Sequence, residues 1–328
     1  MIRSSAPARA GIVGNPTDGY GGSVISTSLA ERASVHLTLA AETVLDICGE
    51  QETIRGPEDV RLTGGYTDVA KAVLLDFPEA LREYRFRLTA RTDIPMHAGL
   101  AGSTAMLVAI LGVVLRLLDI SLNRYEIAEV ARKIELETMN VVCGFHDQYM
   151  ATFGGLNYVD FRDKDPKATG EPVFATIEPL MDVAPLPPFI LASTGVQRHS
   201  GGVHRPLRER WLEGDPLVVR GYERIARLAR EAKRALLRGD WPCLGAALNE
   251  NHAIQRDLGG SGEANERLIA AALDAGALGA KLAGAGQGGT IIALHEAPDY
   301  LARRLTEAGA ARLLRVIPSE GLTVESAY

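Results

Sequence analysis

In the first third of the chain, two short runs rich in β-branched residues are followed by two segments in which hydrophobic and polar residues alternate. These segments are Ala10–Val13, Val24–Ser28, Ala33–Leu39 and Tyr84–Ala90. Enrichment in β-branched residues is typical of strands, and alternation with a period of two is typical of strands with one buried face. The pattern therefore predicts a strand-rich first third with a mostly antiparallel sheet.

Helical spacing appears between and after these strands. It covers Thr67–Phe77, the apolar run Ala105–Leu115, and a segment from Asn123 to about Glu137. Asn123 and Glu126 form a capping-box pattern at the start of the last segment. Its apolar stripe is expected to face the core, and consists of Ile127, Val130, Ala131 and Ile134.

Closely spaced prolines in Asp182–Pro188 mark a domain junction, because proline cannot continue a helix. The residues that follow alternate between predicted strands and Ala- and Leu-rich helices. The strands are 189–193, 290–295 and 312–317, and the helices are 217–237, 241–257, 262–275 and 298–308. A chain of 328 residues exceeds the usual size of one core. We therefore expect an α+β fold with two domains, residues 1–184 and 185–328, and a cleft between them.

Composition narrows the class of protein. A formal net charge of −6 gives no electrostatic footprint for nucleic acid. The three cysteines lack disulfide or zinc-ligand spacing. The first residues lack the apolar core of a signal peptide, and no apolar run reaches the roughly 18 residues of a membrane span. We expect a cytoplasmic protein without nucleic-acid or membrane partners, and a homodimer stays open.

Two glycine-rich runs are candidates for holding phosphate. Gly99–Thr104 directly precedes a predicted helix, whose N-terminal N–H groups attract anions. Taken alone, it is also typical of a helix capped by Ser or Thr. The second run, Lys281–Gly289, contains GxGxxG, but a strand follows it, which argues against a dinucleotide fingerprint. It is either a loop close to a phosphate or sugar, or a tight turn.

Two polar segments are candidates for the acceptor site. Asp147, in a predicted loop after Gly144, could take a proton from a substrate hydroxyl, or could simply form an Asx-turn. Arg9 precedes the turn Asn15–Gly22, whose polar groups could bind sugar hydroxyls or only shape the turn.

These elements, in this order, resemble the GHMP kinases, the superfamily of galactokinase, homoserine kinase and mevalonate kinase. Pro95–Ala105 looks like the family's Pro-x-x-x-Gly-Leu-Gly-Ser-Ser-Ala motif, with Ala101 and Thr104 as departures. Lys281–Gly289 looks like its late glycine run, with Gln287 for a glycine. The resemblance implies a strand-rich N-terminal nucleotide-binding and catalytic domain, a ferredoxin-like C-terminal domain, and ATP with Mg²⁺ as cofactors.

The resemblance also implies roles for individual residues. Asp147 would be the base, with Arg9 beside it, and Thr104 and Glu135 would bind Mg²⁺, with Glu137 as the alternative acid. Nucleotide phosphates would be held by Pro95, Gly99, Leu100, Ala101, Gly102, Ser103, Thr104, Ala105, Gly284 and Gly286. The substrate would contact Asn15, Thr17 and Asp18, and we add Tyr20, Gly144, His204 and Arg208 as candidates.

Finer features concern the substrate. Gly11–Asp18 and Val203–Asp215 look like glucuronokinase, whereas Asp147–Tyr158 looks more like the bacterial heptose-phosphate kinases. The donors clustered at Arg198, His199, His204, Arg205 and Arg208 would suit a carboxylate or a phosphate, or form a solvated basic face. The expected activity is phosphorylation of the anomeric hydroxyl of an acidic sugar, glucuronate first. A heptose-7-phosphate kinase, a galactokinase- or mevalonate-type kinase and a catalytically silent sensor are the alternatives.

Overall fold

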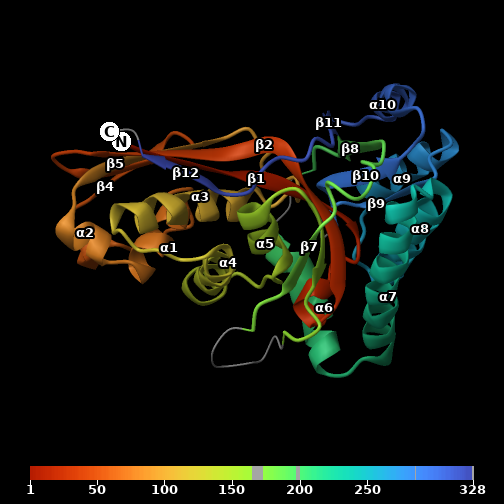
Figure 1. Cartoon of the computed structure of the whole chain (residues 1–328), viewed down its shortest axis with the longest axis horizontal. Helices are drawn as coiled ribbons and strands as arrows, with labels where there is room; N and C mark the ends of the chain where they lie inside the picture. Colours follow the sequence, from red (N-terminus) through yellow and green to blue (C-terminus); the bar gives the residue numbers. More distant parts are fainter. Residues whose placement is uncertain (165–172, 197–199, 285, 327–328) are drawn as a thin grey trace.

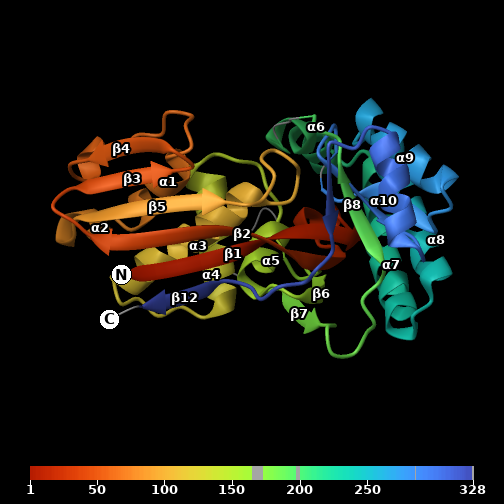
Figure 2. The same ribbon diagram turned by 90° about the horizontal axis from the view of Figure 1, so that it is seen from above.

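A long, twisted sheet forms one end of the molecule. The computed structural model describes residues 1–164, 173–196, 200–284 and 286–326, with backbone only for 200–205. The strand order is β12-β1-β2-β5-β3-β4, and β6 and β7 extend from the far end of β2 (Figures 1 and 2). All pairs are antiparallel except β3 with β5. The strands are Ile2–Val13 (β1), Ser23–Leu39 (β2), Thr43–Ile47 (β3), Glu50–Ile54 (β4), Phe86–Thr92 (β5), Leu156–Asp160 (β6), Thr176–Pro179 (β7) and Thr323–Ser326 (β12).

One face of this sheet is covered by helices (Figure 1). Among them α3 is apolar all round and buried from Thr104 to Leu115, as expected of a helix inside a core. It packs against β1 and β2, so the sheet and this helix fix the position of each other. The helices of this half are Asp68–Asp76 (α1), Glu79–Glu83 (α2), Gly102–Leu117 (α3), Arg124–Lys133 (α4) and His146–Phe153 (α5), with the short turns Thr17–Tyr20 (η1), Pro57–Asp59 (η2) and Ile134–Thr138 (η3).

The second half builds a separate four-stranded antiparallel sheet in the order β11-β8-β10-β9. With β8 counted first, this is the βαββαβ arrangement of a ferredoxin-like unit. Its elements are Phe189–Ser193 (β8), Ser200–Leu212 (α6), Pro216–Arg238 (α7), Trp241–Asp257 (α8), Glu263–Asp274 (α9), Gly279–Leu282 (β9), Thr290–Leu294 (β10), Pro298–Glu307 (α10) and Arg312–Arg315 (β11).

The chain then returns to the first sheet, where β12 pairs with β1. Arg32 holds this return, because its guanidinium donates to the carbonyl oxygens of Ser5, Glu320 and Gly321 at 3.0, 2.6 and 2.8 Å. Both ends of the chain consequently lie at the same edge of the molecule (Figure 1). The division at 184/185 stays a prediction. In the structure the last strand belongs to the sheet of the first half.

The predicted α+β class is confirmed, and so are the strands and helices that the patterns indicated. The capping box is present, with Asn123 Oδ1 accepting from Tyr125 and Glu126 and the Glu126 carboxylate accepting from Asn123 N. Within the described ranges, no helix combines the length and apolarity needed to cross a membrane.

Candidate functional site

The glycine-rich turn Gly99–Ala105 leads straight into α3. Helix capping by Ser or Thr was the alternative interpretation, but the residue before the helix is Ala101, and no side chain caps that end. Ala101 has left-handed backbone angles, φ 61° and ψ 33°, which turn the chain into the helix. The first N–H groups of a helix have no partner within it, so this end presents unsatisfied donors suited to an anion. Ser103 is exposed beside them.

Arg9 connects this turn to the predicted base. From buried β1, its Nε and Nη2 lie 2.8 and 2.7 Å from the same oxygen of Asp147, Oδ1. Its Nη1 donates to the carbonyl of Gly99 at 2.7 Å, and its main-chain N–H donates to Leu100 O at 3.1 Å. We expected Asp147 in a loop. The structure places it in the first turn of α5, with 32% of its side chain exposed.

Asp18 lies against the loop that precedes α5. Its Oδ2 accepts from the main-chain N–H groups of Phe145 and His146 at 2.8 and 3.0 Å. Gly144 has to be glycine here, because an added Cβ would sit 1.9 Å from the same oxygen. The predicted residues Asp18, Gly144 and Asp147 are therefore brought together.

Thr104 and Glu135 form the predicted oxygen pair for a metal. The Thr104 hydroxyl donates to Glu135 Oε1 at 2.8 Å, and Gln148 Nε2 donates to Oε2. Glu135 lies in the π-helical turn η3, which continues α4, whereas Glu137 of the same turn is exposed. A π-turn shifts the side chains that follow it, and such turns often occur at functional sites. The placement favours Glu135 over Glu137 as the metal-facing acid.

Burial raises the pKa of Glu135 from its ordinary value of 4.5 to about 7, against the hydrogen bond from Thr104. A carboxyl with this pKa is about half protonated near neutral pH. The donor set still fits Mg²⁺, which prefers oxygen ligands and usually takes only one or two from the protein.

The late glycine loop reaches the Asn15 turn through Lys281. The buried Lys281 Nζ donates to Asn15 Oδ1 at 2.8 Å, and the amide of Asn15 donates to Gly284 O at 3.4 Å. Burial holds the pKa of Lys281 well below its usual range, and the charge of Arg9 lowers it further. Gly286 is packed so tightly that an added Cβ would meet Gly260 O at 1.7 Å. Residue 285 lies outside the described residues.

The remaining predicted substrate residues differ in what they offer. Thr17 donates its hydroxyl to Gly14 O at 2.7 Å, so within its turn it offers a ligand only an acceptor. Tyr20 packs between Trp211 and Tyr222, with ring centroids 5.0 and 4.8 Å away. Arg208 is half-buried on α6, while the His204 side chain lies outside the described residues.

Sequence reasoning missed three side chains at this site. His146 is buried beside Asp147, with Nδ1 3.6 Å from Oδ1, and burial lowers its pKa to about 4. Its Nε2 is buried without a hydrogen-bond partner among the described residues. Gln148 bonds Glu135, and Arg132 donates from Nε to Gly144 O at 3.0 Å. Only proximity to Asp147 in the sequence could have indicated the first two.

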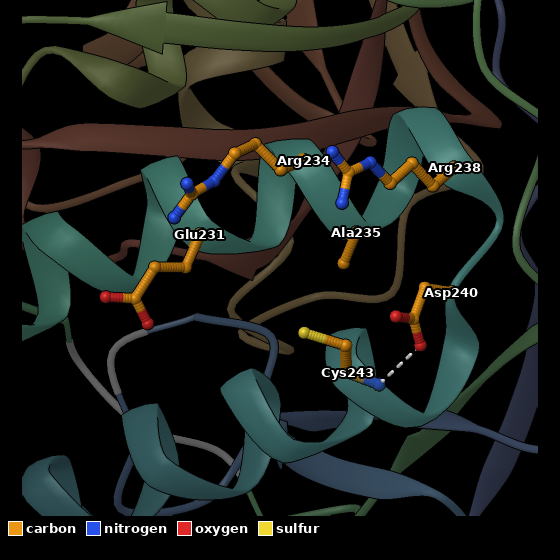
Figure 3. Close-up of a pocket in the computed structure, with 6 residues that line it drawn as sticks. All are labelled: Glu231, Arg234, Ala235, Arg238, Asp240 and Cys243. Atoms are coloured by element: carbon orange, nitrogen blue, oxygen red, sulfur yellow. Dashed lines mark hydrogen bonds between the residues drawn. The ribbon is translucent and has the colours of Figure 1, made fainter.

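A pocket of about 320 Å³ lies elsewhere, between the end of α7 and the start of α8 (Figure 3). Its lining residues are Glu231, Arg234, Ala235, Arg238, Asp240 and Cys243. Asp240 caps α8 there by accepting from Cys243 N at 3.0 Å. None of the predicted site residues lines this pocket.

Comparison with known proteins shows which family the chain belongs to. Residues 67–155 match the model described as GHMP kinases N terminal domain, and residues 232–311 match GHMP kinases C terminal. A mevalonate kinase of Pyrococcus abyssi is 30% identical over 263 residues, covering 78% of this chain and 74% of that protein. The chain belongs to the GHMP kinases. It is an ATP-dependent phosphotransferase with a hydroxyl group as acceptor.

Other relatives of this kinase have names that indicate sugar substrates. Glucuronokinase 1 of Arabidopsis thaliana is 28% identical over 319 residues, covering 90% of this chain and 85% of that protein. A D-glycero-alpha-D-manno-heptose 7-phosphate kinase of Campylobacter jejuni is 26% identical over 310 residues, covering 88% and 87%. The crystal structure of Methanococcus jannaschii mevalonate kinase has the same fold, with a TM-score of 0.75, 18% identity and coverage of 97% and 98%.

The left-handed residue of the turn gives a first test. A non-glycine residue in this conformation costs about 1–2 kcal/mol, so Ala101→Gly should stabilise the kinase by up to about 1 kcal/mol in urea unfolding. ATP affinity should change less than about twofold, because the turn keeps its shape. The matched control is Ala105→Gly inside α3, which should destabilise by about 1 kcal/mol. Equal destabilisation by both changes would contradict the assignment.

The raised pKa of Glu135 gives a second test. The metal-free folded kinase keeps a proton that the unfolded chain releases, so wild type should lose stability relative to Glu135→Gln as pH rises from about 4.5 to about 7. Urea unfolding of both proteins at pH 5, 6, 7 and 8 measures this difference. Glu137→Gln, at an exposed position of the same turn, is the matched control. If the difference in free energy of unfolding between wild type and Glu135→Gln stayed constant with pH, the raised pKa of Glu135 would be refuted.

Proposed function

We propose that this kinase phosphorylates the anomeric hydroxyl of an acidic sugar, with glucuronate as the first candidate, and that it works in the cytoplasm. The observation that carries the proposal is the Arg9 guanidinium, which bonds both the Asp147 carboxylate and the carbonyl of Gly99. It joins the candidate base to the turn that would carry the triphosphate. A hydroxyl beside Asp147 would then lie close to the γ-phosphoryl group.

The chemistry asked of these residues is mainly positioning. Asp147 would accept the proton of the attacking hydroxyl as its oxygen bonds to the γ-phosphorus, and the bond from that phosphorus to the bridging oxygen breaks to release ADP. Arg9, which is 7% exposed, would hold the carboxylate in position by its two contacts with Oδ1. The N–H groups at the start of α3 would hold phosphate oxygens.

Thr104 and Glu135 are the side chains that would hold Mg²⁺, and Ser103 would add a hydroxyl for the phosphates. Bound there, the ion would neutralise charge on the triphosphate. Gln148 and the Thr104 hydroxyl fix both oxygens of the Glu135 carboxyl group before any ligand arrives. Such preorganisation lowers the cost of binding.

The proposed acceptor follows from the relatives and from the basic side chains at the acceptor end. The name of glucuronokinase 1 indicates an acidic sugar as its substrate. Selective binding of a carboxylate needs fixed hydrogen-bond donors such as arginine. Arg208, on α6 beside Tyr20, is such a donor. The main competing function is that of a heptose 7-phosphate kinase, whose substrate is anionic through phosphate instead. A mevalonate-type kinase and a galactokinase-like enzyme also compete with the proposal, whereas a catalytically silent sensor is set aside because the chain is a phosphotransferase.

Asp147→Asn should lower kcat roughly 1,000-fold, because the amide cannot accept the proton. ATP binding, measured by calorimetry, should remain nearly unchanged. The assay is coupled ADP release with glucuronate, galacturonate, glucose, galactose, mevalonate and a heptose 7-phosphate. Asp119→Asn, at an exposed surface position, is the control and should keep full activity.

Full activity of Asp147→Asn would remove Asp147 as the base. If wild type bound ATP tightly but turned over none of these compounds, glucuronate would be excluded as the substrate and the acceptor would be a hydroxyl compound outside this panel.

Thr104→Ala should raise the Mg²⁺ concentration needed for half-maximal activity roughly tenfold, because the hydroxyl ligand is lost. Thr104→Ser keeps the hydroxyl and should stay close to wild type. The measurement is initial rate against free Mg²⁺ at saturating ATP. An unchanged requirement in Thr104→Ala would exclude Thr104 as a ligand.

A further inference from the structure

Arg132, near the C-terminal end of α4, is held in a fixed orientation without a carboxylate partner. Its Nε donates to Gly144 O at 3.0 Å, and its guanidinium carbon lies 3.7 Å from the centroid of the Phe145 ring. Among the described residues no carboxylate lies within 4.0 Å of its nitrogens. The adjacent Lys133, by contrast, pairs with Asp76 at 3.3 Å. One edge of the Arg132 fork is thus anchored, and its terminal nitrogens have no acceptor in the part of the chain that the structure describes.

Arg208 is a second arginine without a carboxylate partner in those same ranges. It lies on α6, next to Leu207, which packs with Trp211, Tyr20 and Tyr222 in one apolar cluster. Arg210, two residues further on, differs in that it pairs with Asp215 at 2.8 Å. Arg208 therefore lies one residue from the cluster that holds Tyr20, and its charge acts on the Tyr20 hydroxyl.

The charges of these two arginines reach each other and the acceptor site. Burial lowers the pKa of Arg132, Cys143 and Glu129 oppose this, and the charge of Arg208 adds to the lowering. Burial raises the pKa of Tyr20 to about 12, as does Asp18, while Arg208 opposes them. Arg132 also bonds the carbonyl of Gly144, the residue whose Cα faces Asp18. Like charges repel, and a bound anion would offset that cost.

We propose that Arg132 and Arg208 together form the subsite that binds the negative group of the substrate, the carboxylate of a sugar acid or the phosphate of a sugar phosphate. This inference rests on the proposed function. Arg132 is a specificity residue that sequence reasoning missed, because the pattern of its helix indicates only a core-facing apolar stripe and a metal-binding acid. It would present a pre-oriented fork to the anion, and Arg208 would supply the second charge.

The test compares Arg132→Met and Arg208→Met with wild type in the full chain. Each change should lower kcat/KM for glucuronate, or for the heptose 7-phosphate if that is the better substrate, about 10- to 100-fold. Turnover of glucose and the KM for ATP should stay within about threefold. Arg132→Lys keeps a charge without the fork and should fall between wild type and Arg132→Met. Lys133→Met and Arg210→Met are matched controls, since both residues already pair with carboxylates.

Equal losses on acidic and neutral sugars would mean that Arg132 only holds the Gly144 loop, and would overturn the subsite. Unchanged selectivity in both variants would overturn it as well. Calorimetry on wild type distinguishes failure of the subsite from failure of the proposed function. If wild type binds glucuronate or the heptose 7-phosphate and both variants weaken that binding, the subsite stands even when no turnover is seen. Wild type that binds neither compound better than glucose contradicts the subsite itself.

Discussion

The site depends on one buried guanidinium, that of Arg9. A charge removed from water needs partners close by, and Arg9 finds them on two elements that lie far apart in the sequence. It contacts Asp147 at 2.7 and 2.8 Å and Gly99 O at 2.7 Å. Strand β1, helix α5 and the turn before α3 are thereby locked to one another. The distance between the candidate base and the phosphate turn is set before any ligand binds.

Other ionisable groups of the site are buried, and burial shifts their pKa values. The pKa of Glu135 is raised to about 7, that of His146 is lowered to about 4, and that of Lys281 is well below its usual range, each mainly by burial. Such groups lower stability relative to an apolar core. They are typical of sites where charge has to be placed against a charged ligand. The site is therefore preorganised at some cost in stability.

Much of the fold could be predicted because its signals are local. The alternation in β2 and β5, the capping box at Asn123 and the prolines before β8 each act within a few residues. Helix α6 was not predicted, because Gly201, Gly202 and Pro206 argue against a helix. The β3–β4 hairpin was missed for a similar reason, since its turn places Cys48 at φ 52°, a conformation that favours glycine.

For the site, too, only the features with local sequence signals could be predicted. The turn before α3 and the positions of Asp18, Asp147 and Thr104 could be taken from motifs. Ala101 and Gln287, which replace glycines of those motifs, both adopt positive φ, so the backbone conformation is the same although the residue type differs. Lys281 and Arg132 could not be assigned from the sequence, since Lys281 finds Asn15 across 266 positions and Arg132 bonds a main-chain carbonyl. Contacts of that kind exist only once the chain has folded.

The most direct test of the central claim is a crystal structure with glucuronate, Mg²⁺ and a non-hydrolysable ATP analogue. The account predicts the anomeric oxygen within hydrogen-bond distance of Asp147, phosphate oxygens on the main-chain N–H groups of Gly102–Thr104, and the Arg9 contacts to Asp147 and Gly99 unchanged. A triphosphate bound away from that turn, or a sugar hydroxyl that does not reach Asp147, would contradict it.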